Sequence, residues 1–215
     1  MLGYNREPPN FPMQGHKRLS SPRTARQANS HQEISMRRAT SWQQFRIVPH
    51  SVVPVNWRSW VMDRGSLTQR LVKASIGDFK VRVTRLEWAC PTVNETLKLG
   101  IASRQKALIR EVDLLCCGRA VVRARSVIPA ATLTGEERQL KHLGTRPLGA
   151  FLFSSRAMVR QPIELAGFQG SQRQAIYGRR SVFLLHDKPL LVSEIFLPEL
   201  LSLGSATTTK RFGIR

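Results

Sequence analysis

From Val52 onward, hydrophobic positions recur with the periods of strands and helices, whereas residues 1–50 show neither period. Alternation of apolar and polar residues predicts a half-buried strand, because successive side chains of a strand point to opposite faces. Alternating or continuous apolar runs predict strands at 79–84, 107–115, 120–128, 180–185 and 189–197. Short turns at 116–119 and 186–188 join the last four of these into two β-hairpins.

Two helices are predicted from capping signals, in which Ser or Thr is followed three residues later by Gln or Glu. The signal at 66–69 precedes a helix expected over Leu67–Ser75. The signal at 134–137 precedes a second helix, which we expect to stop at Gly144 because glycine suits the position after a helix.

The remaining stretches have weaker patterns. Residues 151–160 and 161–165 are expected to be extended, 91–103 to form an irregular loop or flap, and 167–178 to form a loop. Strands joined mainly by hairpins, with a few helices, indicate an α+β domain built on one antiparallel sheet.

The chain divides into a basic N-terminal extension (1–50), a single domain (51–205) and a C-terminal tail (206–215). The extension is rich in Pro, Ser, Arg and Gln and carries too few apolar residues to offset the entropy of ordering it. It is expected to be a disordered tail, a targeting peptide, or an in-frame extension upstream of a start at Met13 or Met36.

Composition supports a folded domain, since hydrophobic residues make up 41% of the 215. No run approaches the roughly 20 uninterrupted apolar residues that span a bilayer, which argues against a membrane span. The formal charge is +20, of which the extension carries eight of 34 basic and two of 14 acidic residues. Such a charge suits nucleic-acid binding, but the basic residues of the domain are scattered, and the same charge suits an enzyme that attracts a small polyanion. The Arg179–Arg180 pair is interpreted as guarding a strand edge.

Other candidate chemistry is weak. Three cysteines (Cys90, Cys116 and Cys117) form no C-x-x-C pair, which argues against a disulfide framework or a zinc knuckle and favours reduced thiols in the cytoplasm. His142 and His186 fall in a predicted helix and a turn, and no metal-ligand spacing links them to a carboxylate. The G-x-S-x-G turn of hydrolases is absent from the sequence. We therefore expect no metal site.

Charged residues stand on otherwise apolar strand faces. Arg110 shares a face with aliphatic residues in 107–115, and Glu194 does so in 189–197. The case for Arg125 is weaker, because the opposite face of its strand is the more apolar one. An inward charge is costly unless it is paired or binds a ligand. Two interpretations follow: a structural ion pair between Arg110 and Glu194, or an apolar pocket that binds a carboxylic acid.

Several segments in order resemble one family. They are Ile109–Leu115 (IREVDLL), Ala124–Pro129 (ARSVIP), Leu143–Gly149 (LGTRPLG), Phe151–Phe153 (FLF), Tyr177–Ser181 (YGRRS) and Lys188–Pro198 (KPLLVSEIFLP). This series resembles bacterial chorismate pyruvate-lyases, over about Trp57 to Leu203. The resemblance implies a single antiparallel-sheet domain with helical flaps over a buried ligand pocket.

The resemblance also implies roles for five residues. The family's arginine that binds the substrate carboxylate falls on Arg110, and its carboxylate near the ligand hydroxyl falls on Glu194. Backbone or apolar contacts fall on Leu148 and Leu67. The second active-site arginine falls on Arg125, which is expected near the enolpyruvyl carboxylate of chorismate.

The function implied is that of a carbon–oxygen lyase: elimination of pyruvate from chorismate to give 4-hydroxybenzoate for ubiquinone synthesis, by a cytoplasmic monomer without cofactor. Whether Glu194 takes a proton or only positions the substrate stays open. A non-catalytic module of the same fold that binds a small aromatic acid is the alternative, and specific nucleic-acid binding is not expected.

Overall fold

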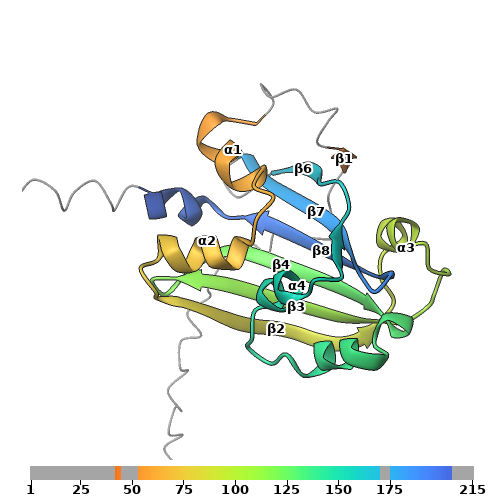
Figure 1. Ribbon diagram of the computed structural model, residues 1–215. Coiled ribbons are helices and arrows are strands. Elements are labelled where there is room, and N and C mark those ends of the chain that lie inside the picture. Colours follow the sequence, from red (N-terminus) through yellow and green to blue (C-terminus); the bar gives the residue numbers. More distant parts are fainter. Residues whose placement is uncertain (1–41, 45–52, 170–174, 205–215) are drawn as a thin grey trace, which may run out of the picture. The chain divides into compact units, whose positions relative to one another are not determined.

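The computed structural model describes residues 42–44, 53–169 and 175–204, and within them eight antiparallel strands form one sheet (Figure 1). The strands are β1 (Gln43–Gln44), β2 (Phe79–Ala89), β3 (Ala107–Cys116), β4 (Arg119–Pro129), β5 (Met158–Arg160), β6 (Glu164–Gln169), β7 (Ala175–Leu185) and β8 (Lys188–Phe196). Their order is β1-β6-β7-β8-β4-β3-β2. Strand β5 also pairs with β7, on the same edge as β6 but nearer the C-terminal end of β7.

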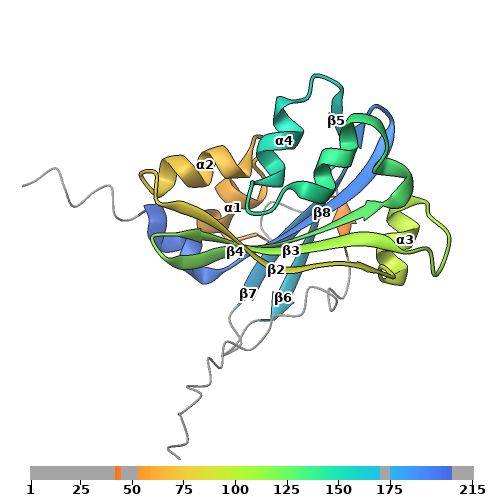
Figure 2. The same ribbon diagram turned by 90° about the horizontal axis from the view of Figure 1, so that it is seen from below.

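The helices lie on both faces of this sheet. They are α1 (Val55–Val61), α2 (Leu67–Ala74), α3 (Val93–Leu99), α4 (Leu148–Ser154) and the 3₁₀ segments η3 (Ala130–Thr132), η4 (Gly135–His142) and η6 (Pro198–Gly204). Figure 2 shows α2 and α4 together above one face. The α3 helix packs on the opposite face, through its Glu95. No helix among the described residues is long and apolar enough to cross a membrane.

The predicted α+β class, the two hairpins and the helix at 67–75 are confirmed. The Ser66 hydroxyl accepts a hydrogen bond from the Gln69 amide at 3.4 Å, as the capping signal requires. The β7–β8 hairpin turns through His186 and Asp187, both with positive φ. A turn of that kind matches the right-handed twist of the paired strands.

The loop predicted at 91–103 is wrong, because this stretch contains α3. The helix begins with a complete capping box between Thr92 and Glu95, and it ends at Gly100, whose φ of 65° is left-handed. The sequence carries the same Thr-x-x-Glu signal that was used elsewhere.

The extended prediction for 151–160 is wrong in its first part, where α4 forms. Leu148 and Leu152, one helical turn apart, are both buried against the sheet. The loop predicted at 167–178 is also too long, since β6 continues to Gln169 and β7 begins at Ala175.

The helix predicted after Thr134 is present as the 3₁₀ segment η4. Thr134 makes no capping hydrogen bond to it. Glu137, the residue expected to complete the capping box, instead contacts His186 and Lys188 at the β7–β8 turn, at 2.7 and 2.8 Å. These contacts attach η4 to the end of the sheet.

Gln43 and Gln44, within the segment expected to be disordered, form β1 and pair with β6. Apart from Trp42, the rest of that segment lies outside the described residues, as does the predicted tail 206–215.

Candidate active site

A cavity lies between one face of the sheet and the helices α2 and α4. Its empty volume is about 560 Å³. The charged residues that line it are Arg110, Arg160, Arg179 and Glu194, and most of the other lining residues are aliphatic or aromatic. This lining, with three guanidiniums among apolar side chains, suits a ligand with acidic groups.

Strand pairing explains why these side chains share one face. One row across the sheet consists of Val112, Ala124, Glu194 and Arg179, on β3, β4, β8 and β7. The adjacent row consists of Arg110, Ser126 and Val192. Because side chains alternate along a strand, both rows point into the cavity and the residues between them point away.

Arg110 is 3% exposed and projects from β3. Its Nη2 donates to the carbonyl oxygens of Gly144 and Arg146, both at 3.0 Å, in the loop that leads into α4. It forms no ion pair with any described carboxylate, and burial lowers the pKa of its guanidinium. The structural ion pair considered between Arg110 and Glu194 is therefore wrong, and no described carboxylate neutralises Arg110.

Glu194 is paired with Arg179 instead. Arg179 Nε donates to Glu194 Oε2 at 2.5 Å, and its Nη1 donates to the carbonyl oxygens of Trp60 and Asp63. Arg179 is 1% exposed. This pair fixes the orientation of the one carboxylate that lines the cavity.

The interpretation of Arg179–Arg180 as an edge guard is wrong, because β7 lies inside the sheet. Arg180 points to the other face, where its Nε donates to Glu164 at 2.6 Å. Both guanidiniums are buried and paired, one on each face. The dibasic pair alone carried no sign of this, since it depends on the strand order.

Arg160 also lines the cavity, and no pattern in the sequence pointed to it. It ends the three-residue strand β5, which is too short to show a period. Its Nε donates to Ser181 Oγ at 3.0 Å and its Nη1 to the Arg64 carbonyl oxygen at 3.1 Å. Burial and the neighbouring charge of Arg179 lower the pKa of Arg160 to about 10, so that it stays protonated at neutral pH.

Leu67 and Leu148 both line the cavity, from the first turns of α2 and α4. The two helices approach closely at Gly149: a Cβ added there would lie 2.9 Å from Thr68 Oγ1. Glycine at this position therefore lets α4 lie against α2 over the cavity.

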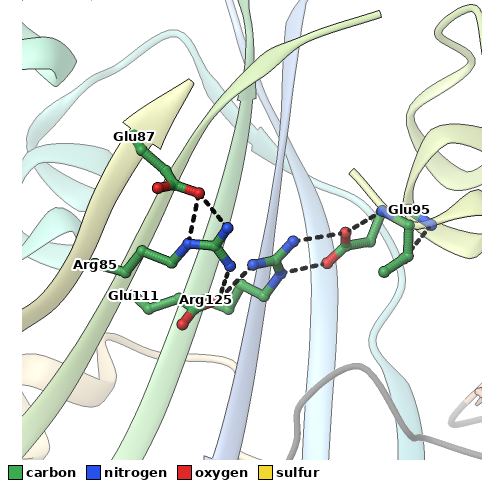
Figure 3. A network of polar contacts seen from close by, with 6 residues as sticks. Arg85, Glu87, Glu95, Glu111 and Arg125 are labelled. Carbon is green, nitrogen blue, oxygen red and sulfur yellow. Dashed lines mark hydrogen bonds and ion pairs between the residues drawn. The ribbon is translucent and has the colours of Figure 1, made fainter. Parts of the chain in front are cut away.

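Arg125 does not line the cavity, contrary to the expectation for this residue. It is paired in register with Glu111, one residue from Arg110, so it points to the opposite face. Figure 3 shows it between two carboxylates. Its Nε and Nη2 donate to Glu95 at 2.7 and 3.0 Å, and its Nη1 donates to Glu111, which also contacts Arg85. Arg125 therefore attaches α3 to the back of the sheet.

Among residues 42–44, 53–169 and 175–204, no group of three or more His, Cys, Asp or Glu side chains could hold a metal ion. The cysteines expected to be reduced are free thiols. His142 is exposed and His186 is half exposed in its turn.

Comparison with known proteins decides the family. A model of the chorismate lyase family matches residues 36–204. The chain belongs to the chorismate lyase family. A relative from Methylococcus capsulatus, named probable chorismate pyruvate-lyase, is 45% identical over 155 residues, covering 67% of this chain and 96% of the relative. One of the same name from Thiobacillus denitrificans is 40% identical over 173 residues, covering 74% and 92%.

Similar solved structures include PhnF from Mycobacterium smegmatis. The TM-score is 0.47 at 18% identity, covering 64% of this chain and 66% of that one. A GntR-family transcriptional regulator from Bacillus cereus gives a TM-score of 0.44 at 11% identity, covering 57% and 93%.

Proposed function

We propose that this member of the chorismate lyase family is a chorismate pyruvate-lyase. It eliminates pyruvate from chorismate without a cofactor and releases 4-hydroxybenzoate for ubiquinone synthesis, as a cytoplasmic monomer. The observation that carries the proposal is the buried cavity in which an unpaired arginine, Arg110, and an oriented carboxylate, Glu194, are set among apolar walls.

The two groups stand on the same face of the sheet and both line the cavity. They project from β3 and β8, which are separated by β4. Two strand spacings place their backbones about 10 Å apart across the sheet. A ligand held between them would meet a guanidinium from one strand and a carboxylate from the other, as an aromatic ring with a carboxylate and a hydroxyl requires.

The reaction needs orientation and movement of one proton. The C4–H electron pair completes the aromatic ring as the C3–O bond breaks. Enolpyruvate leaves, and protonation of its methylene carbon gives pyruvate. The ring becomes aromatic, so the overall change is strongly downhill, and the protein need only lower the barrier.

In this scheme Arg110 binds the ring carboxylate, because its planar fork suits a carboxylate and its position is fixed by two backbone carbonyls. Glu194 contacts the C4 oxygen and assists movement of the C4 proton, with Arg179 holding its orientation. Leu148 and Leu67 contact the ring and exclude water.

The test is to mix purified protein with chorismate, with chelator and without added cofactor, and to measure 4-hydroxybenzoate and pyruvate by chromatography. Equal amounts of both are expected. Arg110→Met should raise KM at least tenfold, because it removes one charge-assisted contact, worth about 1.5–3 kcal/mol. Glu194→Gln should lower kcat while 4-hydroxybenzoate still binds.

Arg156→Met is the matched control, because Arg156 is exposed and lies outside this cavity. It should leave kcat and KM unchanged. Binding of 4-hydroxybenzoate with no turnover by the unsubstituted protein would refute the lyase and favour a binding module. Full activity of Glu194→Gln would remove the role of Glu194 in proton movement.

A further inference from the structure

The charges that line the cavity do not balance. Three guanidiniums meet one carboxylate, and that carboxylate is engaged by Arg179. Arg110 and Arg160 have no ion-pair partner among the residues that the structure describes; their hydrogen bonds go to backbone carbonyls and, for Arg160, to the Ser181 hydroxyl. One buried positive charge, on Arg110, and one half-buried positive charge, on Arg160, therefore remain without an anion. Burying a charge in this way is costly unless a ligand compensates it.

Arg160 is held in place without being neutralised. Ser181 and the Arg64 carbonyl fix two edges of its guanidinium, and its Cζ lies 5.1 Å from the centre of the Phe183 ring. These contacts restrict the side chain to one position in the cavity wall. A cation that is oriented in advance within an apolar site binds an anion more strongly than a mobile surface cation does.

Arg160 also lies near Glu194. The charges of Arg179 and Glu194 both act on its guanidinium. In chorismate, the enolpyruvyl ether is attached to the carbon next to the one that bears the hydroxyl. If Glu194 contacts the hydroxyl, the enolpyruvyl group extends from a neighbouring atom toward the same part of the cavity.

We propose that Arg160 binds the enolpyruvyl carboxylate of the substrate, the role that the sequence analysis assigned to Arg125. This inference rests on the proposed function. The two unpaired arginines then match the two carboxylates of a dianion. As the C3–O bond breaks, negative charge grows on the departing enolpyruvate, and Arg160 stabilises that charge.

The two ligands of the reaction provide a selective test, because 4-hydroxybenzoate keeps only the ring carboxylate. The variants are Arg160→Met, Arg160→Lys and Arg110→Met, with Arg156→Met as the matched control from the same segment. For each, steady-state kinetics give kcat and KM for chorismate, titration calorimetry gives the Kd for 4-hydroxybenzoate, and thermal unfolding gives Tm.

Arg160→Met should lower kcat/KM for chorismate by at least tenfold and leave the Kd for 4-hydroxybenzoate within about twofold. Arg160→Lys, which keeps the charge without the fork, should recover part of the loss. Arg110→Met should weaken both ligands. This split between ligands separates substrate binding from a structural role, which would change Tm without selecting between them.

If Arg160→Met weakens the binding of both ligands equally, or leaves the kinetics unchanged, the inference is overturned and the proposed function stands. If Arg160→Met does not fold, the decision falls to Arg160→Lys: kcat/KM equal to that of the unsubstituted protein would also overturn it. An unsubstituted protein that makes no 4-hydroxybenzoate would refute the proposed function and the inference with it.

Discussion

Arg125 should support the stability of the fold and not the chemistry, and Arg125→Met tests this directly. Arg125 and Glu95 are 2% and 7% exposed, and they share two hydrogen bonds. Burial raises the pKa of Glu95, but the hydrogen bonds and charge of Arg125 outweigh burial, so that the net shift is downward. The arginine thus stabilises the ionised carboxylate.

Removal of one partner leaves a buried charge, which typically costs about 3–5 kcal/mol. Most of this cost falls on Glu95, since Glu111 is partly exposed and keeps its contact with Arg85. For a chain of 215 residues, a loss of this size lowers Tm by roughly 6–20 °C. Activity per folded molecule should stay within about twofold, because the cavity is on the other face.

The loss should depend on pH with a definite sign. In the unsubstituted protein the pKa of Glu95 is below its ordinary value, so the pair adds stability above pH 4.5 that is lost as the pH falls. In Arg125→Met the buried carboxylate has lost its partner, so its pKa should rise, and protonation should relieve the cost at low pH. The difference in Tm is therefore expected to be larger at pH 8 than at pH 5.

Urea unfolding and calorimetry of Arg125→Met and of Arg125→Met/Glu95→Gln decide the matter. Glutamine keeps the capping box with Thr92 and removes the charge, so the double variant should regain most of the stability. An unchanged Tm combined with a hundredfold loss of kcat in Arg125→Met would refute this reasoning and return Arg125 to the site.

Two further predictions concern the contacts of η4 with the β7–β8 turn and the packing of α4 on α2. The hydrogen bond from Lys188 and the contact with His186 lower the pKa of Glu137 to about 2, against an ordinary value of 4.5. The stability that this cluster contributes is therefore present above pH 4.5 and lost toward pH 2. Calorimetry should show that the Tm difference between the unsubstituted protein and Glu137→Gln shrinks from pH 5 to pH 3. A Tm difference that stays constant over this range would contradict the prediction. Gly149→Ala places a methyl group 2.9 Å from Thr68 Oγ1. Overpacking should cost about 1–3 kcal/mol, and the higher helix propensity of alanine should offset about 1 kcal/mol of this cost. Urea unfolding should therefore show a net decrease in the free energy of unfolding. Adding Thr68→Ala should recover the lost stability. A double variant that is as unstable as Gly149→Ala would show that the clash is with another residue.

The parts of the site that the sequence predicted are those where a charge interrupts an apolar strand face. Arg110 and Glu194 were found in this way, because both lie on strands long enough to show the period of two. Arg160 could not be found so, since β5 has three residues. The role of Arg179 depends on β7 being an interior strand, which is a property of the topology and not of the local pattern.

The helices show a different limit. The capping signal of α2 is confirmed by the structure, and α3 begins with an equivalent signal at Thr92 and Glu95. Thr134 carries the same signal and does not cap η4: its hydroxyl donates to the Ala131 carbonyl oxygen, and Glu137 contacts the β7–β8 turn. A local capping pattern therefore indicates where a helix can begin, and tertiary contacts decide whether its side chains serve the cap.

Arginines are buried on both faces of the sheet, so burial alone does not distinguish the candidate site from the structural networks. The difference is whether each arginine has a carboxylate partner. Across the back face, pairing aligns Glu164, Arg180, Ser193, Arg125, Glu111 and Arg85 in one row. Each arginine of that row has a carboxylate within 4 Å. On the cavity face, Arg179 is matched by Glu194, and Arg110 and Arg160 are not matched by any described carboxylate. Arg110 is buried and Arg160 is half-buried, so an anion that enters the cavity with two charges of its own would compensate both guanidiniums.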